Sequence, residues 1–304
     1  MSLLIALTGA TGFIGQYLLQ ELPRRGHRVR VLLRRPTNMR VQGSSAVIGD
    51  ISRPQNMGAA LEGVDAIVHS AGLPGTMSGI PEDDYRVLNT EATISLAHAA
   101  RRAGAKRFIF LSSIRAQCGP TADQVLTEDL EARPTDAYGK SKLAAEQGLA
   151  QIDVDWVALR LVLTYGPGVK GNMAQLMRLA RSPYPLPLGG IKARRSLLSL
   201  DNLVEAIDAT LVTLEPLRRP LIVADPEPVS VPEMVAAMRR GLGRSPRLIP
   251  VPAPALRAIL SLAGKSELYA RLTGSLAVDP SALRGIGWRP ATQTAAGLAA
   301  LMRA

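Results

Sequence analysis

Cysteine is almost absent from this sequence of 304 residues, because Cys118 is the only one. A disulfide framework and a multi-cysteine metal site are therefore excluded, and we expect no metal. No apolar run of about 18 residues occurs, so the sequence predicts no membrane-spanning helix. The first residues, MSLLIALTGATGFIG, lack a basic leader, which argues against a signal peptide. We therefore expect a cytoplasmic protein with no membrane partner.

Acidic residues are scarce, with 25 against 36 basic residues and a net charge of +11. None occurs between Trp156 and Leu200 or between Met234 and Ser266. An excess of basic over acidic residues can indicate nucleic-acid binding. No aromatic stacking residues are interleaved with these charges, however, so we expect no nucleic-acid partner. The first acid-free stretch favours an anionic small ligand. The second fits a solvated basic surface equally well.

Apolar residues make up 47% of the chain, enough for a sizeable core. In the first half, short apolar runs alternate with helical patterns at Ile14–Leu22, Asp84–Ala103 and Tyr138–Ala150. The six expected strands are Leu3–Thr8, Arg28–Leu33, Ala46–Ile48, Ala66–His69, Arg107–Leu111 and Trp156–Leu161. This order predicts an α/β protein with a Rossmann-type, doubly wound parallel sheet.

The composition of the sequence changes after about residue 165, where proline and glycine begin to cluster. We expect a Rossmann domain over residues 1–165 and a smaller substrate domain over residues 166–304, partly interleaved with the first. The amphipathic stretch Pro254–Leu272 fits either membrane-surface association or a cover for the substrate domain, and we favour the cover.

A glycine-rich turn follows the first expected strand directly, in the run TGATGFIG. Gly9 and Gly12 allow a tight turn and let the backbone approach a pyrophosphate, while Gly15 lets the next helix pack close to the strand. The position between a strand and a helix at the start of the chain favours a dinucleotide site over a structural turn.

The second expected strand ends in Arg34 and Arg35, where an acid is usual when the adenosine ribose carries a free 2′-hydroxyl. Two guanidinium groups suit a 2′-phosphate, so NADP is favoured over NAD; the alternative is that both point to solvent. Asp50 follows the third strand on the same edge, where it contacts adenine or is a surface turn residue.

Tyr138 and Lys142 lie four residues apart at a helix start, and therefore on one face. A tyrosine with a pKa near 10 is a poor base at neutral pH, and we expect the lysine and a positive nicotinamide ring to lower that pKa. Ser113 ends the fifth strand, where catalytic groups lie in open α/β sheets, and can hydrogen-bond a reacting oxygen.

Together these motifs resemble the extended short-chain dehydrogenase/reductase family, in its NAD(P)-dependent nucleotide-sugar epimerase/dehydratase branch. The resemblance rests on TGATGFIG, HSAG at 69–72, SSI at 112–114, YGKSK at 138–142 and LTYGPG at 163–168. RSLLSLD at 195–201 and GWRP at 287–290 extend it over nearly the whole chain.

The resemblance implies that Tyr138 is the acid/base, that Lys142 binds the nicotinamide ribose and tunes Tyr138, and that Ser113 orients the substrate. Asn89 would support the site, and Asn172 and Arg195 would hold the diphosphate of a nucleotide sugar. The expected cofactor-binding residues are Gly9, Thr11, Gly12, Phe13, Ile14, Arg34, Arg35, Asp50, Ile51, Ala71, Gly72, Asn89, Tyr138 and Lys142. The expected substrate-binding residues are Ser113, Tyr138, Asn172 and Arg195.

Three departures from the family pattern bear on the reaction. Dehydratases of this branch carry an Asp-Glu pair after the catalytic serine, whereas this chain has Ile114 and Arg115, so sugar dehydration is not expected. Gln117, Cys118 and Gly119 stand where Tyr-Gly is usual. The asparagine expected three residues after Arg160 is replaced by leucine.

The leading hypothesis is a nucleotide-sugar 4-epimerase that acts on a UDP-sugar by transient oxidation at C4. The alternative is an NADPH-dependent reductase of a 4-keto nucleotide sugar or another carbonyl compound, which the two arginines favour. A non-catalytic NAD(P)-sensing protein is a third reading, but such proteins commonly lack the tyrosine–lysine pair. By analogy with the family, the helices around Asp84–Ala103 and Tyr138–Ala150 predict a homodimer.

Overall fold

The computed structural model describes residues 2–36, 43–75, 79–262, 264 and 266–303. Its centre is a seven-stranded parallel sheet in the order β10-β6-β5-β4-β1-β2-β3. The strands are β1 (Leu4–Thr8), β2 (Arg28–Leu33), β3 (Gly43–Val47), β4 (Ala66–His69), β5 (Arg107–Ser113), β6 (Trp156–Leu161) and β10 (Arg219–Val223). The strand order reverses between β1 and β4, the switch point at which open α/β sheets bind ligands.

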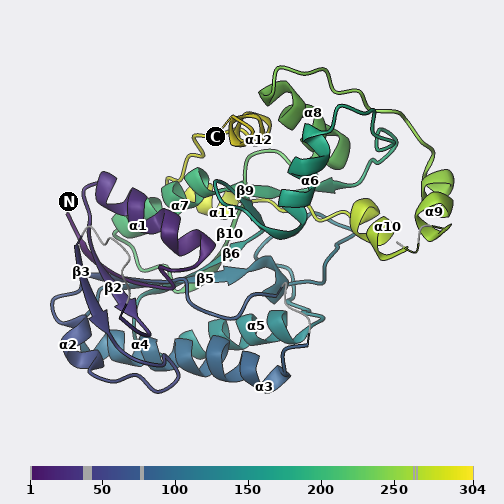
Figure 1. The fold of residues 1–304 in the computed structure, drawn as a ribbon. Coiled ribbons are helices and arrows are strands. Elements are labelled where there is room, and N and C mark those ends of the chain that lie inside the picture. Colours follow the sequence, from purple (N-terminus) through teal and green to yellow (C-terminus); the bar gives the residue numbers. More distant parts are fainter. Residues whose placement is uncertain (1, 37–42, 76–78, 263, 265, 304) are drawn as a thin grey trace.

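Helices cover both faces of the sheet (Figure 1). The helices α1 (Phe13–Arg24) and α7 (Leu200–Val212) lie on one face, and α2 (Met57–Leu61), α4 (Ala92–Arg102) and α5 (Ala137–Leu149) on the other. Successive side chains of β1 enter opposite cores: Ile5 and Leu7 join the first, Leu4 and Ala6 the second. The expected doubly wound Rossmann-type sheet is therefore confirmed.

The sheet has one strand more than the six that the sequence predicted. β10 comes from the second half of the chain and pairs only with β6, at the sheet edge. Pro220 lies within it, and a proline is tolerated on an edge strand because one side of that strand needs no backbone donor. The short run RPLIV with its proline gave no clear strand pattern, which is why this strand was missed.

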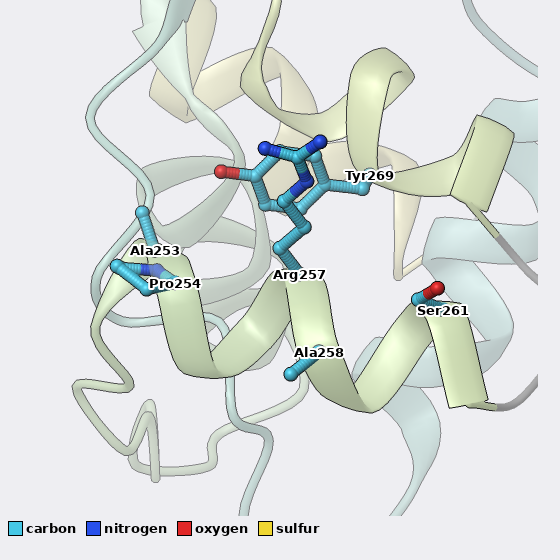
Figure 2. A pocket seen from close by; sticks show the side chains of 6 residues that line it. All are labelled: Ala253, Pro254, Arg257, Ala258, Ser261 and Tyr269. Carbon is cyan, nitrogen blue, oxygen red and sulfur yellow. The ribbon is translucent and has the colours of Figure 1, made fainter.

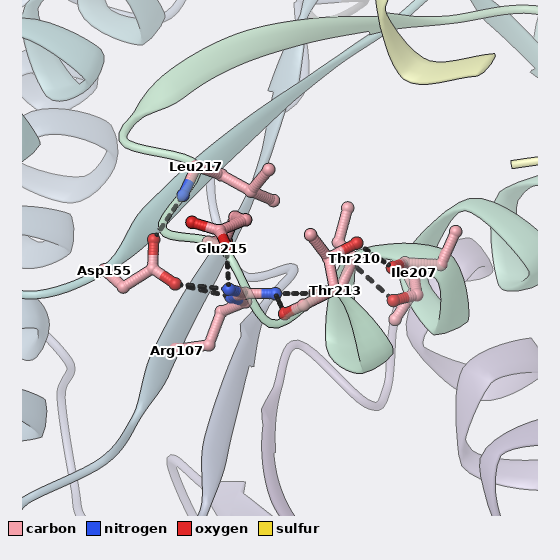
Figure 3. Close-up of polar contacts among 8 residues, drawn as sticks. Arg107, Asp155, Ile207, Thr210, Thr213, Glu215 and Leu217 are labelled. Carbon is pink, nitrogen blue, oxygen red and sulfur yellow. Dashed lines mark hydrogen bonds and ion pairs between the residues drawn. The ribbon is translucent and has the colours of Figure 1, made fainter. Parts of the chain in front are cut away.

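Arg107 fixes the connection that leads to β10 (Figure 3). Its guanidinium donates to Asp155 at 2.7 Å and to the carbonyls of Thr213 and Glu215 at 2.7 and 3.0 Å. Asp155 in turn accepts the backbone N–H of Leu217 at 2.8 Å. Arg107 begins β5, so this cluster ties the end of α7 to the amino edge of the sheet, opposite the edge that carries the expected site.

A third core lies in the remaining part of the chain, above the sheet in Figure 1. Its helices are α6 (Gly171–Arg181), α8 (Val231–Gly241), α9 (Ala253–Leu262), α10 (Ser266–Thr273) and α12 (Thr294–Leu301). The other strands and α-helices of the chain are β7 (Leu163–Tyr165), β8 (Arg194–Arg195), β9 (Leu197–Ser199), β11 (Val229–Ser230), α3 (Glu82–Tyr85) and α11 (Ser281–Gly285). Within the described residues, no helix combines the length and apolar character that crossing a bilayer requires.

Candidate active site

The turn between β1 and α1 can be built only with glycine at two places. Gly9 has φ +71°, and a Cβ there would lie 2.7 Å from the backbone nitrogen of Ala71. A Cβ on Gly15 would lie 2.1 Å from the carbonyl oxygen of Gly9. Because glycine has no side chain at these two positions, α1 and the loop after β4 can pack directly against the end of β1.

The N-terminus of α1 has free donors for an anion. Gly12 is its N-cap, no side chain caps this end, and its first turn contains no acid. Thr11 and Gly12 are exposed, while Phe13 and Ile14 pack partly into the core. Uncapped N–H groups and the positive end of the helix dipole suit a pyrophosphate, so the residues present fit a dinucleotide.

Arg34 and Asp50 lie together beyond the ends of β2 and β3, with 3.3 Å between guanidinium and carboxylate. The backbone N–H and hydroxyl of Ser52 also donate to this carboxylate, and they, with Arg34, lower the pKa of Asp50. Arg34 remains 70% exposed and Arg35 is exposed. Ile51 is half-buried against the core. Both guanidinium groups therefore remain accessible, and Arg34 lies beside an acid that Ser52 holds in place.

His69, the last residue of β4, is fully buried and links two segments of the fold. Its Nδ1 lies 2.7 Å from the hydroxyl of Thr8, and its Nε2 lies 3.0 Å from that of Thr93. Burial, with a contribution from the nearby Lys142, lowers the pKa of His69 to about 3. It is therefore neutral at physiological pH. The hydroxyl of Thr8 also accepts the N–H of Ala71, so this network shapes the loop after β4.

Asn89 lies in a π-helical turn, Arg86–Glu91, that interrupts the single helix predicted over Asp84–Ala103. Such turns are frequent at functional sites. Its Oδ1 accepts the N–H of Leu73 at 2.7 Å, and its Nδ2 donates to the hydroxyl of Ser141 at 3.1 Å. A Cβ on Gly72 would lie 2.8 Å from this Oδ1. Asn89 thus joins the loop after β4 to helix α5.

Ser113 and Tyr138 meet at the carboxyl end of β5. Asp136 caps α5 by accepting the N–H of Gly139 at 2.7 Å and pairs with Arg115, which fixes the first turn that carries Tyr138. Burial raises the pKa of Tyr138, and the hydrogen bond with Ser113 opposes that rise. Burial thus acts against the lowering that we expect from Lys142 and a positive nicotinamide ring, and that expectation stays a prediction.

Lys142 is buried one turn further along α5. Its Nζ donates to the carbonyl of Leu111 at 3.0 Å and lies 4.5 Å from the centroid of the Phe110 ring. The Tyr138 ring centroid is 6.0 Å away. Burial lowers the pKa of Lys142 to about 8, while Glu146 opposes that shift. A small change in environment therefore suffices to change its protonation near neutral pH.

Glu146, which was not predicted as a site residue, lies four residues after Lys142 and is 4% exposed. Its carboxylate accepts from Ser112 Oγ at 2.5 Å and pairs with Arg160 at 2.7 Å. Arg160 also donates to Gln117 at 3.0 Å. The spacing from Lys142 was the available signal, but the partners come from other elements. Gln117 is thereby engaged in the protein interior, and Cys118 beside it is buried with a raised pKa.

The two residues expected to hold a diphosphate lie in the second half of the chain. Asn172 is exposed in the first turn of α6. Arg195, in β8, lies 3.5 Å from the carbonyl of Pro120, and burial lowers its pKa. Pro120 belongs to the segment that follows Ser113, so Arg195 faces the same loop region. The roles assigned to all these residues remain predictions.

A separate hollow lies between α9 and α10 (Figure 2). Arg257 and Tyr269 face it, together with small side chains of α9. None of the residues expected at the active site lines it, so we place the candidate active site at the sheet edge.

A glycine turn at the switch point of a doubly wound sheet, with serine, tyrosine and lysine gathered at the end of β5, defines a class: dinucleotide-dependent enzymes of the Rossmann fold. A family model agrees, since the NAD dependent epimerase/dehydratase family matches residues 5–222. The chain belongs to this family.

Individual relatives carry several activities. The chain is 36% identical over 298 residues to a UDP-glucose 4-epimerase of Vibrio cholerae, covering 94% of this chain and 90% of the relative. It is 29% identical over 286 residues to a ceramide reductase of Caulobacter vibrioides, covering 90% and 80%. A solved structure of MoeE5 in complex with UDP-glucose and NAD superposes with a TM-score of 0.74 at 27% identity, covering 98% and 97%.

Proposed function

We propose that this protein is an NAD(P)-dependent nucleotide-sugar 4-epimerase acting on a UDP-sugar. The observation that carries the proposal is the gathering of Ser113, at the carboxyl end of β5, with Tyr138 and the buried Lys142 of α5, whose Nζ lies 6.0 Å from the centroid of the Tyr138 ring. The similarity to a UDP-glucose 4-epimerase and to the MoeE5 complex supports the choice of substrate class.

Three residues of the site have separate roles in the proposed reaction. Ser113 orients the C4 hydroxyl, and Tyr138, as phenolate, takes its proton and later returns it. A bound nicotinamide supplies the acceptor and donor of the C4 hydride. The Lys142 ammonium favours the phenolate electrostatically. Water elimination is not supported, because the pair that dehydratases place after the serine is replaced here by Ile114 and Arg115.

The diphosphate of the substrate would be held by Arg195 and Asn172. Arg195 keeps a cation in a half-buried position beside the loop that follows Ser113. Asn172 presents an amide at the start of α6, where backbone N–H groups lack a side-chain cap. The guanidinium of an arginine, a side-chain amide and the N–H groups of a helix N-terminus can all donate hydrogen bonds to phosphate oxygens.

Incubation with UDP-glucose, UDP-galactose and their N-acetyl forms tests the proposal, with the products separated by chromatography. We expect interconversion of one pair, and a loss of at least about a hundredfold in Tyr138→Phe. That variant should still bind NAD(P)H. If all four sugars are returned unchanged, the proposal is wrong for this substrate set.

A second candidate is an NADPH-dependent reductase of a 4-keto nucleotide sugar or another carbonyl compound. The exposed Arg34 and Arg35 favour it, because they suit a 2′-phosphate and a reductase uses free NADPH. The similarity to a ceramide reductase gives it further support. Denaturing the purified protein and identifying the released nucleotide separates the two: NAD⁺ favours the epimerase, and NADP(H) or an empty site favours the reductase.

For the cofactor we propose NADP over NAD, on the strength of the same two arginines.

For assembly we propose a cytoplasmic homodimer formed through α4 and α5. Within one chain these two helices pack closely, since a Cβ on Gly148 would lie 2.3 Å from the side chain of Ile94, so they would meet a second copy as a pair. Light scattering at micromolar concentration tests this assembly, and a monomeric mass would contradict it.

A further inference from the structure

Arginines gather where the C-terminal end of α6 meets the end of α8. Arg239, on α8, is 1% exposed, and a buried guanidinium is usually paired with a carboxylate. Among the described residues, however, Arg239 donates hydrogen bonds to backbone carbonyls and pairs with no carboxylate. Its acceptors are the carbonyls of Ala180, Ser182, Tyr184, Pro246 and Arg247. Arg244 donates to the carbonyl of Arg181 at 2.6 Å, and Arg247 to that of Pro183 at 3.2 Å. The fold therefore brings several cations together on one surface.

Five further arginines, on α6, on α8 and in the loop after α8, are exposed, and we call them the arginine surface: Arg178, Arg181, Arg240, Arg244 and Arg247. In the part of the chain that the structure describes, none of the five lies within 4 Å of a carboxylate. The flanking sequence supplies none, because both acid-free stretches meet here. Such a concentration of unpaired positive charge attracts an anionic partner.

Exposed apolar side chains lie among these charges. Leu179 stands between two of the arginines on α6 and is 46% exposed, and Tyr184 is 73% exposed. Ile249 is 49% exposed, and its backbone pairs with Leu186 and Gly189, which places it beside the same segment. Binding of a free anion or of a single-stranded nucleic acid does not require exposed leucine and isoleucine side chains. Basic and apolar side chains mixed on one surface are typical of proteins that rest on an anionic bilayer.

We propose that the arginine surface docks on anionic phospholipids, with its guanidinium groups on the phosphates and Leu179, Tyr184 and Ile249 entering the interface. Docking of this kind needs no spanning helix. Helix α6 runs from this surface to Asn172, a distance of about 15 Å for its length. The docked protein would therefore hold the proposed diphosphate-binding end of α6 close to the membrane. The proposed epimerase, whose substrate and cofactor are both water-soluble nucleotides, does not require this.

Sedimentation of the full-length protein with vesicles tests the proposal, using phosphatidylcholine alone and phosphatidylcholine with 30% phosphatidylglycerol. We expect binding to the anionic vesicles only, weakened by salt. The test variant is R178Q/R181Q/R240Q, whose side chains make no hydrogen bond or ion pair within the described residues. With roughly a fivefold loss for each arginine, the partition coefficient should fall about a hundredfold. L179S/Y184S should also weaken binding, even at constant charge.

The matched control is R28Q/K106Q/R219Q, which removes three exposed cations at the amino edge of the sheet, outside α4 and α5, and leaves the same net charge. It should bind anionic vesicles nearly as well as the wild type. The proposal is overturned if the wild type ignores anionic vesicles, or if both triple variants lose binding equally, which would leave net charge as the cause. Stronger binding to an oligonucleotide than to vesicles, lost in the same test variant, would also overturn it in favour of nucleic acid.

Discussion

Glu146→Gln removes a buried negative charge one helical turn from Lys142. The two residues are on one face of α5, about 6 Å apart at this spacing. At an effective dielectric constant of about 20, the lost attraction corresponds to about two pH units. Glu146 holds the pKa of Lys142 up against burial, so the variant should lower that pKa further below its present value of about 8.

The assay is the pH dependence of kcat/KM with the nucleotide sugar that the wild type converts. If the Lys142 ammonium is needed, wild-type activity should fall as the pH rises through about 8. In E146Q the same fall should occur at a pH about two units lower. The variant should also lose about 3–5 kcal/mol of stability, because Arg160 remains buried without its partner.

Arg160→Gln is the matched control, since it breaks the same ion pair from the other side and costs comparable stability. It removes a cation, so it should leave the fall in activity where it is or move it to higher pH. Opposite displacements in the two variants identify an electrostatic effect on Lys142. Displacements in the same direction, or none in E146Q, would refute the reasoning.

Three further outcomes follow from the same contacts. Lys142→Met should abolish activity yet stabilise the fold by up to about 3 kcal/mol at pH 7, because the buried ammonium costs free energy below its folded pKa of about 8. That advantage should disappear in denaturation curves as the pH approaches 10.5, and an advantage independent of pH would contradict it. Arg107→Met, which breaks the pair with Asp155, should lower the stability by about 3–5 kcal/mol and leave kcat unchanged. R34A/R35A should raise the KM for NADPH by more than about tenfold and that for NADH little; equal KM values in variant and wild type would mean that both side chains face water.

The sheet was predictable to the extent that its signals are local. β2, β4 and β6 have the predicted bounds, because each is a short run in which buried apolar residues predominate. The glycine turn and the spacing of Tyr138 and Lys142 are also local patterns, and both are present as expected.

The rest depends on contacts between distant segments. The partners of Glu146 lie on β5 and β6, and Arg107 pairs with carbonyls about a hundred residues away. β3 begins three residues earlier than expected, because its polar residues pair with the buried β2 and need no apolar pattern of their own. Burial, which raises the pKa of Tyr138, likewise follows from the packing of the whole site.

The most direct measurement of the central claim follows the hydrogen at C4. UDP-galactose carrying deuterium at C4 is incubated with the protein until UDP-glucose forms, and the product is analysed by mass spectrometry and NMR. Transient oxidation at C4 predicts that deuterium stays at C4 of the product, with conversion lost in Tyr138→Phe. Deuterium washed out to solvent, or undiminished conversion by the tyrosine variant, would contradict the account.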